Sequence, residues 1–478
     1  MHREYRQARI AKDRNYDGKF FFGVKTTGVF CRPSCPSPTA REENVVYFKE
    51  MFEALDRHFR PCLRCRPDIH LDYATRNPGG TLVVNAALKM IYDGYLNDHG
   101  VGDLAGALSV SERHLRKLFI ENLGVPPVKI ARYHRALFAK KLLIYSDQSV
   151  TDVAFASGFG SLRQFNQVFK EIFGMVPSQL RKGREDSGAD AGNTALFLPY
   201  GSGFALGPIL DFLRPRAVKG VEWVTDESYA RTFRTSRSQG WFQVRDLPKK
   251  QALCLEIQCD NVQCYMEIYN RVRRVFDLDT DFSAMTPRFR ADVRLAPGLI
   301  NGEVPRLPKA FDPFEFCVRA VLGQQVSVQA ATTLAGRIAA RSGRETPGEF
   351  PAGLDYFFPG PEELLETDLD EIGLTRAREA TLIRVAQGVV DQAFSLDLHQ
   401  DFDSFQAAFS RLKGIGEWTV NYVAMRGLGM ADSFPATDLG ILKALEEKGE
   451  RPAKKRVLEL AEAWRPYRAY AALCLWNQ

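Results

Sequence analysis

The chain of 478 residues contains an internal repeat, and this repeat constrains its fold more than any other feature. The segment Ser111–Phe119 recurs 50 residues later as Ser161–Phe169, and in each copy a Glu, a Gly and a Pro follow at matching distances. The spacing of apolar residues predicts a short helix, a tight turn and a second helix capped by the serine. The repeat therefore predicts two helix–turn–helix units, which begin at Val101 and Val150.

The exposed faces of the two second helices carry mainly basic and amide side chains. A helix–turn–helix unit places such side chains in the major groove of DNA, although a plain helical bundle would also have a polar face. The predominance of Arg, Lys, His, Gln and Asn favours DNA binding. The candidate contacts are Arg113, His114 and Lys117 in the first copy and Arg163, Gln164 and Gln167 in the second. The segment from Leu82 to Lys182 resembles the AraC-type DNA-binding domain, which implies a long connecting helix from Pro127 to about Tyr145.

Charge is distributed unevenly along the chain. Residues 1–185 contain 29 basic and 19 acidic residues, a net charge of +10, whereas the whole chain has a net charge of +6. A basic segment suggests a polyanionic partner, although a solvated basic surface would have the same composition. No apolar run reaches the length of a membrane span, and the charged N-terminus does not resemble a secretory signal. We therefore expect a cytoplasmic, nucleoid-associated protein without a membrane partner.

Four of the nine cysteines form two close pairs, Cys31-x3-Cys35 and Cys62-x2-Cys65. Nine cysteines in a chain of this length are too few for a disulfide scaffold, and the other five occur in apolar contexts typical of buried side chains. Two close pairs suit a tetrahedral site for one Zn²⁺, and four-cysteine zinc sites are usually structural. Because a zinc-bound thiolate can also act as a nucleophile, the spacing alone leaves both roles open.

The residues around these cysteines resemble the N-terminal domain of the Ada methylphosphotriester-repair family. The resemblance rests on Asp17–Phe20, Gly23–Cys35 and Arg60–Pro67, and it covers Met1 to about Tyr73. It implies that Cys31 is both a zinc ligand and a methyl acceptor, and that the stoichiometric transfer consumes it. Alkylation would remove one negative charge and strengthen DNA binding. The resemblance thus implies a damage-sensing transcriptional activator, with RNA polymerase as a further partner.

The clearest motif of the C-terminal half is Leu412–Tyr422, in which Gly414 and Gly416 precede a predicted helix. Glycines at the start of a helix expose backbone N–H groups at the positive end of its dipole, which suits a DNA phosphate. Lys413, just before the hairpin, can contact the same phosphate. Taken alone, the two glycines could also form a plain turn between helices.

Together with Phe434–Asp438, this motif resembles the helix–hairpin–helix DNA glycosylases, specifically the AlkA-type 3-methyladenine glycosylases. The resemblance extends from Phe204 to Asn477 and includes Asp211–Arg216 and Ala320–Ser327. It implies that Asp438 is the catalytic carboxylate. It also implies a base pocket, whose candidate residues are Trp418, Tyr422, Trp476, Gln324 and Gln325.

A 3- or 7-alkylated purine already carries positive charge, so it can leave without a general acid. Asp438 can then stabilise the cationic sugar or position a water molecule, and the aromatic rings can stack on a flipped cationic base. Those rings could equally belong to a packed core. Bifunctional family members carry a lysine at the position of Trp418, so we expect a monofunctional glycosylase without lyase activity. Gln325 stands where AlkA-like proteins insert an apolar wedge into the duplex; a polar residue can still fill the gap, and Gln324 beside it is a second candidate for this role.

These features together predict a multidomain, mainly helical chain with α+β parts that acts as a monomer and resembles an Ada–AlkA fusion. The expected segments are a zinc methyl-acceptor domain at 1–76, a tandem helix–turn–helix domain at 80–182, a linker at 183–193, a β-rich, TATA-binding-protein-like subdomain at 194–303 and a helix–hairpin–helix domain at 304–478.

One alternative is an alkylation-responsive activator whose glycosylase half only binds DNA, although the presence of Asp438 argues against it. Another is a small-molecule-responsive regulator of the AraC type, which would need a ligand-binding domain that the four-cysteine segment does not resemble. Repair of O6-methylguanine is not expected, because the Pro-Cys-His-Arg acceptor motif is absent from the sequence.

Overall fold

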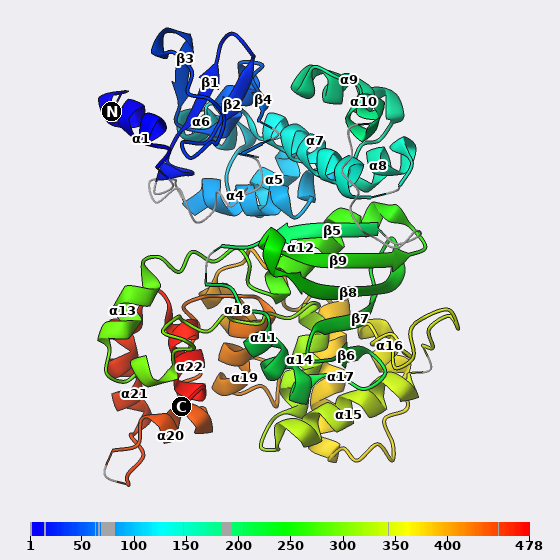
Figure 1. Cartoon of the computed structure of the whole chain (residues 1–478). Helices are drawn as coiled ribbons and strands as arrows, with labels where there is room; N and C mark the ends of the chain where they lie inside the picture. The colour runs from blue at the N-terminus through cyan, green and yellow to red at the C-terminus, as the bar shows by residue number, and fades with distance from the viewer. Residues whose placement is uncertain are drawn as a thin grey trace. The chain divides into compact units, whose positions relative to one another are not determined.

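The computed structural model is mainly helical and contains two β-sheets among the residues that it describes (Figure 1). These residues are 2–13, 16–62, 64–65, 67, 82–146, 148–182, 194–201, 203–342, 344–447 and 449–478. The predicted linker at 183–193 lies outside them, and so does Asn77–Gly80, whose Pro and two Gly predict a turn after the cysteine segment. The chain divides into two compact units, one of residues 1–199 with 256–270 and one of residues 200–255 with 271–478. This architecture confirms the predicted multidomain, mainly helical class with α+β parts.

A small sheet of four strands, in the order β3-β1-β2-β4, holds the cysteine segment. Strand β1 (Phe21–Val24) pairs antiparallel with β2 (Val29–Cys31) and β3 (Val45–Phe48), and β4 (Arg60–Pro61) runs parallel to β2. Helices α1 (His2–Ala11) and α2 (Met51–Asp56) belong to the same region. The sheet register pairs Cys31 with Phe22, so this cysteine is fixed at the end of a strand.

Both helix–turn–helix units form as the repeat predicts, as α5 (Val101–Ala107) with α6 (Glu112–Leu123) and α8 (Val150–Ala156) with α9 (Leu162–Phe173). The Ser111 hydroxyl accepts the backbone N–H of His114 at 3.3 Å, and the Ser161 hydroxyl accepts that of Gln164 at 3.2 Å. Figure 1 shows the long helix α7 between the two helix–turn–helix units, and its bounds of Pro127–Tyr145 match the prediction. Helix α4 (Leu82–Tyr92) precedes the first unit, and α10 (Pro177–Lys182) follows the second.

Helix α2 of the cysteine segment packs against α7. The rings of Phe52 and Tyr133 stack at 6.1 Å with an interplanar angle of 11°. The Tyr133 hydroxyl donates to Asp56 at 3.3 Å, and Asp56 also forms an ion pair with Lys129. These contacts join the two regions that the sequence assigns to alkylation sensing and to DNA binding.

The second sheet has five strands in the order β5-β9-β8-β7-β6. Their bounds are Thr194–Pro199, Glu222–Val224, Ser228–Arg234, Gln239–Leu247 and Ala252–Cys259 for β5 to β9. Helix α12 (Tyr265–Val275) follows β9, and Phe276 at its end packs edge-on against Tyr229 of β7 at 5.8 Å. The predicted β-rich stretch is therefore present.

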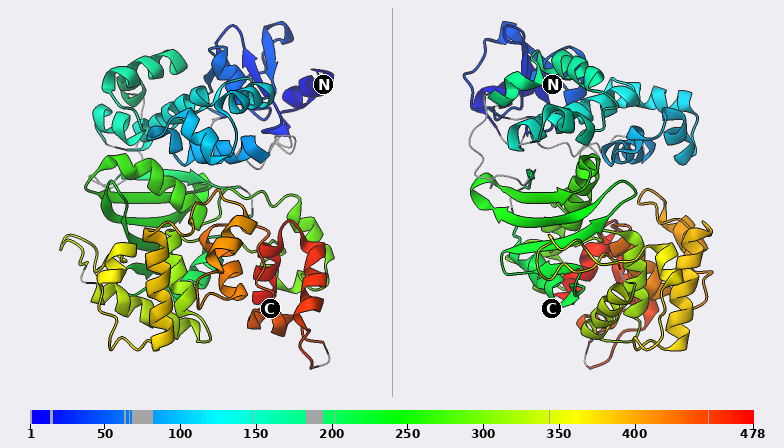
Figure 2. Two further views of the ribbon diagram at one scale, coloured as in Figure 1. Left: turned by 180° about the vertical axis from the view of Figure 1, so that it is seen from behind. Right: turned by 90° about the vertical axis from the view of Figure 1, so that its right-hand side faces the viewer.

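The helices after this sheet form two apolar cores. The first core contains residues of α14 (Pro313–Leu322), α15 (Val328–Arg341), α16 (Pro361–Glu366), α17 (Arg376–Val390), α18 (Phe402–Phe409) and α19 (Glu417–Tyr422). The second contains residues of α13 (Met285–Ala291), α20 (Leu439–Ala444), α21 (Lys454–Ala461) and α22 (Arg468–Trp476). Helix α11 (Gly207–Leu213) precedes β6. Figure 2 shows the helices of the second unit gathered on one side of β6–β8.

A buried ion network connects the sheet to α14. Arg231 of β7 donates to Glu315 at 2.5 Å, and Arg319 donates to both Glu222 and Glu315 at 3.0 Å. Burial opposes the charge of Arg319, but the carboxylates of Glu222 and Glu315 outweigh it and raise the pKa of Arg319 above its ordinary value. Because removal of one partner would leave a buried charge uncompensated, this network should hold α14 firmly on the sheet.

Two further expectations can be compared with the fold. No helix in the described part of the chain has both the length and the hydropathy that crossing a bilayer requires. Among the five cysteines outside the two close pairs, four are buried as predicted, whereas Cys259 is partly exposed.

Candidate zinc centre and glycosylase cleft

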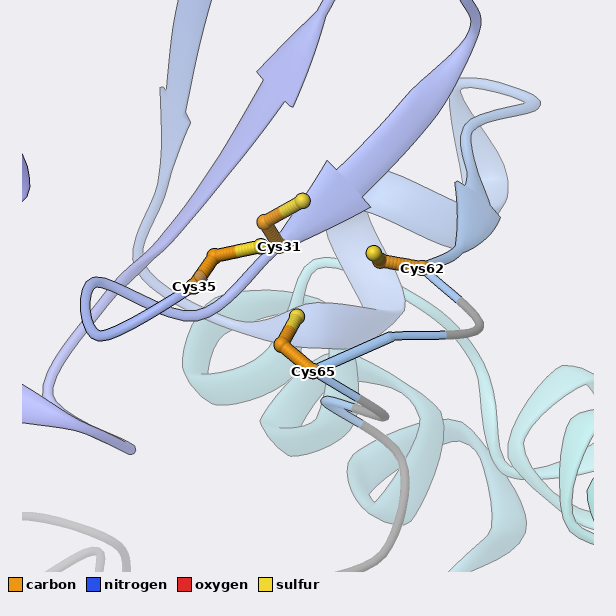
Figure 3. A group of neighbouring side chains, drawn as sticks. All are labelled: Cys31, Cys35, Cys62 and Cys65. Carbon is orange, nitrogen blue, oxygen red and sulfur yellow. The ribbon is translucent and has the colours of Figure 1, made fainter. Parts of the chain in front are cut away.

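The four paired cysteines converge on one point, as Figure 3 shows. Cys31 ends β2, Cys35 lies in the loop that follows, and Cys62 and Cys65 come after β4. All four side chains are buried, and their sulfur atoms lie within 4.8 Å of one another. A tetrahedral zinc with Zn–S distances of about 2.3 Å places its sulfurs about 3.8 Å apart, which this cluster can meet with small rotations. The cluster therefore forms the four-cysteine zinc site that the sequence predicts.

Asp17 fixes the loop between the first two ligands. Its carboxylate accepts the backbone N–H of Ser34 at 3.0 Å and the Ser34 hydroxyl at 2.5 Å. Arg32, directly after Cys31, lies 3.5 Å from the same carboxylate. The sequence motif contained Asp17, but its role in the loop depends on a contact across 17 residues that the spacing did not reveal.

Asp438 lies at the edge of a cleft of about 1690 Å³ in the second unit. It is the N-cap of α20, and its Oδ1 accepts the backbone N–H groups of Gly440 at 2.9 Å and Ile441 at 3.3 Å. The indole N–H of Trp476 donates to Oδ1 at 2.8 Å, and that of Trp418 donates to Oδ2 at 2.8 Å. Four donors therefore orient this carboxylate, and no sequence pattern predicted the two indole hydrogen bonds.

The three predicted pocket aromatics come together in the cleft. The rings of Trp418 and Tyr422 stack at 4.9 Å with an interplanar angle of 19°, and Trp476 meets Tyr422 edge-on at 6.2 Å. Phe316 adds a fourth ring, 5.2 Å from that of Tyr422. All four residues line the cleft, so they present aromatic surface to a planar ligand.

Two arginines that sequence reasoning did not single out surround the Tyr422 hydroxyl. Arg426 donates to the phenolic oxygen at 3.0 Å. Burial alone would raise the pKa of Tyr422, but the charges of Arg426 and Arg216 outweigh it and lower that pKa. Burial and the charge of Arg426 lower the pKa of Arg216 to about 10. Arg216 belongs to the quoted segment Asp211–Arg216, which was the only sequence signal for it.

The hairpin has the geometry that its glycines predict. Gly414 has a φ of 99°, and Gly416 is the N-cap of α19. Lys413, Gly414 and Gly416 are exposed, so a phosphate can reach them. Gln325 is also exposed and has a φ of 56°.

Gln324 lines the cleft, but its side chain is engaged with the hairpin. Its amide nitrogen donates to the Gly414 carbonyl and to the Thr419 hydroxyl, each at 3.0 Å. The described part of the cleft also contains residues that the sequence did not indicate: Arg319, Arg378, Leu439 and Lys443.

The predicted DNA-contacting residues of the two helix–turn–helix units are all exposed on α6 and α9. These residues are Arg113, His114, Lys117, Arg163, Gln164 and Gln167. Leu115, Phe119, Phe165 and Phe169 on the opposite faces are fully buried. Each second helix therefore has the one-sided polarity that docking in a DNA groove requires.

Models of three protein families match successive parts of the chain. They are described as the metal binding domain of Ada at residues 4–68, a helix-turn-helix domain at residues 104–183 and the AlkA N-terminal domain at residues 195–312. One relative matches nearly the whole chain: the probable bifunctional transcriptional activator/DNA repair enzyme AlkA of Mycobacterium tuberculosis is 36% identical over 98% of this chain and 94% of its own length.

The chain belongs to this family of Ada–AlkA fusion proteins. Separate relatives of each half support the same assignment. DNA-3-methyladenine glycosylase 2 of Escherichia coli is 32% identical over 56% of this chain and 92% of its own length. The bifunctional transcriptional activator/DNA repair enzyme Ada of Escherichia coli is 32% identical over 38% of this chain and 49% of its own length. An Ada–AlkA fusion thus combines in one chain the regions that Escherichia coli carries in two.

The solved structure of a 3-methyladenine DNA-glycosylase from Archaeoglobus fulgidus has the same fold as the C-terminal part. It covers 59% of this chain and 96% of its own, with a TM-score of 0.51 at 20% identity. The match to the Mycobacterium tuberculosis relative covers nearly the whole chain, and the match to the metal binding domain of Ada covers the cysteine segment. The zinc site therefore lies in the Ada-like part of the chain, and the cleft lies in the AlkA-like part.

The two hairpin glycines should differ sharply in their tolerance of alanine. A Cβ on Gly414 would lie 2.2 Å from the Thr381 hydroxyl and would occupy a left-handed backbone, whereas a Cβ on Gly416 would meet no atom within 4 Å. We expect Gly414→Ala to cost about 2 kcal/mol or more and Gly416→Ala less than about 1 kcal/mol. Thermal unfolding followed by circular dichroism measures both, and equal losses would contradict this account of the hairpin.

Proposed function

We propose that this chain removes alkylated purines of the 3-methyladenine type from DNA by hydrolysing the N-glycosidic bond. The observation that carries the proposal is the Asp438 carboxylate, which two indole N–H groups hold at the edge of an aromatic cleft. Double-stranded DNA would bind at the hairpin through Lys413, Gly414 and Gly416, where exposed N–H groups at the start of α19 suit a phosphate.

The flipped base would enter between the aromatic rings. Trp418, Tyr422 and Trp476 offer electron-rich faces that attract a cationic alkylated base more strongly than an ordinary one. Arg426 donates to the Tyr422 hydroxyl, and the charges of Arg426 and Arg216 lower the pKa of this phenol. Selectivity for damaged bases would follow from charge rather than from a base-specific hydrogen bond.

Bond cleavage would then depend on Asp438. As the base departs with its bonding electron pair, positive charge develops on the sugar, and the fixed carboxylate stabilises it without reorganising. The carboxylate can also accept a proton from the water molecule that attacks the sugar. Glycosylases that also have lyase activity carry a catalytic lysine at the position of Trp418. Because this chain lacks that lysine, we expect the DNA strand to remain intact and the product to be an abasic site.

Replacement of Asp438 by Asn tests this assignment. The variant keeps an N-cap side chain but loses the negative charge, so we expect base release to fall at least about 100-fold. Single-turnover release of 3-methyladenine from alkylated duplex DNA measures the rate. Asp292→Asn is the matched control, because Asp292 accepts an indole N–H from Trp464 outside the cleft.

If the wild type releases no 3-methyladenine, the glycosylase function is excluded. The result would then favour the alternative in which the C-terminal half only binds DNA. Borohydride trapping tests the lyase question in the same reactions. A trapped adduct would contradict the monofunctional mechanism, and it would point to Lys443, the lysine that lines the cleft.

We also propose that Cys31 accepts methyl groups from DNA methylphosphotriesters. When Zn²⁺ is bound, it keeps its cysteine ligands as thiolates at neutral pH. The Cys31 sulfur attacks the methyl carbon, the carbon–oxygen bond breaks, and the phosphodiester anion leaves with the electron pair. The product is a stable thioether, so each chain reacts once.

Methylation would also provide the signal for transcription. It replaces a thiolate by a neutral thioether and so removes one negative charge beside DNA, which strengthens phosphate binding. The exposed faces of α6 and α9 would then hold a promoter site, with RNA polymerase recruited to it. We expect the chain to act as a monomer, because its two helix–turn–helix units already supply two groove-binding helices.

Mass spectrometry of the chain after incubation with methylated DNA tests the acceptor. We expect one added methyl group on Cys31 and none on the other three ligands. Cys317→Ser is a suitable control, because Cys317 is a buried thiol outside the zinc site. A methyl group that still arrives in a Cys31→Ser variant with zinc retained would show that the acceptor is another cysteine.

A further inference from the structure

One face of α17 contacts both loops at the mouth of the cleft. The first loop, Gly323–Val326, follows α14 and carries Gln325, and the second is the hairpin Lys413–Gly416. Arg378, Thr381 and Arg384 are spaced three residues apart along α17, so they lie on the same side of the helix. This spacing lets a single helix hold two loops that are far apart in the sequence.

Arg378 holds the first loop through its backbone. Its guanidinium donates to the Gln324 carbonyl at 2.7 Å. That carbonyl belongs to the peptide bond between Gln324 and Gln325, so its orientation is coupled to the φ of Gln325. This φ is 56°, in the left-handed region that costs a residue other than glycine about 1 kcal/mol or more. The hydrogen bond therefore stabilises a conformation that the backbone alone disfavours.

The second loop is held by the same helix. Arg384 donates to the Lys413 carbonyl at 3.0 Å, and Gly414 packs closely against Thr381. The side chain of Gln324 then bridges the loops, because its amide donates to the Gly414 carbonyl and to the hydroxyl of Thr419, the neighbour of Trp418. Loop, hairpin and α19 thus share one continuous set of hydrogen bonds.

We propose that Arg378 is a positioning residue for base excision. By fixing the Gln324–Gln325 peptide, Arg378 holds Gln325 where it can insert into the duplex while the adjoining hairpin binds a DNA phosphate. Insertion and phosphate binding then occur in a single orientation of the protein on DNA. A flipped nucleotide leaves a gap in the stack that an inserted side chain must fill. The hydrogen bonds of the Gln324 side chain, in turn, attach its loop to the hairpin. This inference rests on the proposed glycosylase function.

Two duplexes distinguish this role from general damage to the cleft. Each contains one 7-methylguanine, which is paired with cytosine in the first duplex and unpaired in a bulge in the second. If Arg378 acts through insertion and flipping, Arg378→Ala should lower the single-turnover rate about 30-fold on the paired target and less than about threefold on the bulged one. Fluorescence of a 2-aminopurine beside the target should show the same loss of unstacking in the paired duplex.

Matched variants complete the experiment. Arg376→Ala, an exposed arginine on the same helix, should leave both rates unchanged. Arg378→Lys should restore part of the paired rate, since an ammonium group can still donate to the carbonyl. If Arg378→Ala does not fold, Arg378→Gln replaces it, and the ratio of the two rates remains the readout.

Equal loss on both duplexes, or no loss on either, would overturn the proposed role of Arg378. A wild-type chain that releases no 3-methyladenine from alkylated duplex DNA would instead overturn the glycosylase function on which this role rests.

Discussion

The glycosylase half depends on the convergence of three helices on one carboxylate. Asp438 caps α20, Trp418 donates to it from α19, and Trp476 donates to it from α22, near the end of the chain. Helix α19 belongs to one apolar core and α20 and α22 to the other, so the cleft lies where the two cores meet. The packing of both cores therefore positions the Asp438 carboxylate, which in the proposed mechanism faces the developing positive charge of the sugar.

In the proposed functions, the two halves would use the same physical principle on different targets. Each would hold an anionic group beside alkylated DNA: the Cys31 sulfur, at the end of a strand of the cysteine segment, and the Asp438 carboxylate, to which two indoles donate. Their approach to DNA differs, since residues 1–185 carry a net charge of +10 whereas the rest of the chain is slightly acidic. The front half can attract phosphates through overall charge. The glycosylase half needs a local site, and we propose the exposed hairpin before α19 for that role.

The sequence predicts best what depends on neighbouring residues. The caps at Ser111 and Ser161 are found where the pattern places them, because a cap depends on local residues. The helix from Pro127 to Tyr145, which the resemblance to the AraC-type domain implies, is found as well. The zinc ligands are also found, since two close pairs leave little choice. Contacts between distant elements were not predictable: the tryptophans were expected as stacking surfaces, and their hydrogen bonds to Asp438 depend on how α19, α20 and α22 pack. For the same reason, nothing in the sequence indicated the hydrogen bond from Arg378 to the Gln324 carbonyl. The roles of individual pocket residues remain predictions.

The orienting role of the two indole N–H groups on the Asp438 carboxylate is the feature on which the proposed base excision most depends. It can be tested by replacing Trp476 with benzothienylalanine, in which sulfur takes the place of the N–H while the ring shape is kept. The same replacement at Trp464, which donates to Asp292 outside the cleft, is the control. A hydrogen bond to a charged group contributes about 1.5–3 kcal/mol, so single-turnover release of 3-methyladenine should fall about tenfold or more at position 476 and stay unchanged at position 464. An unchanged rate at position 476 would contradict the account.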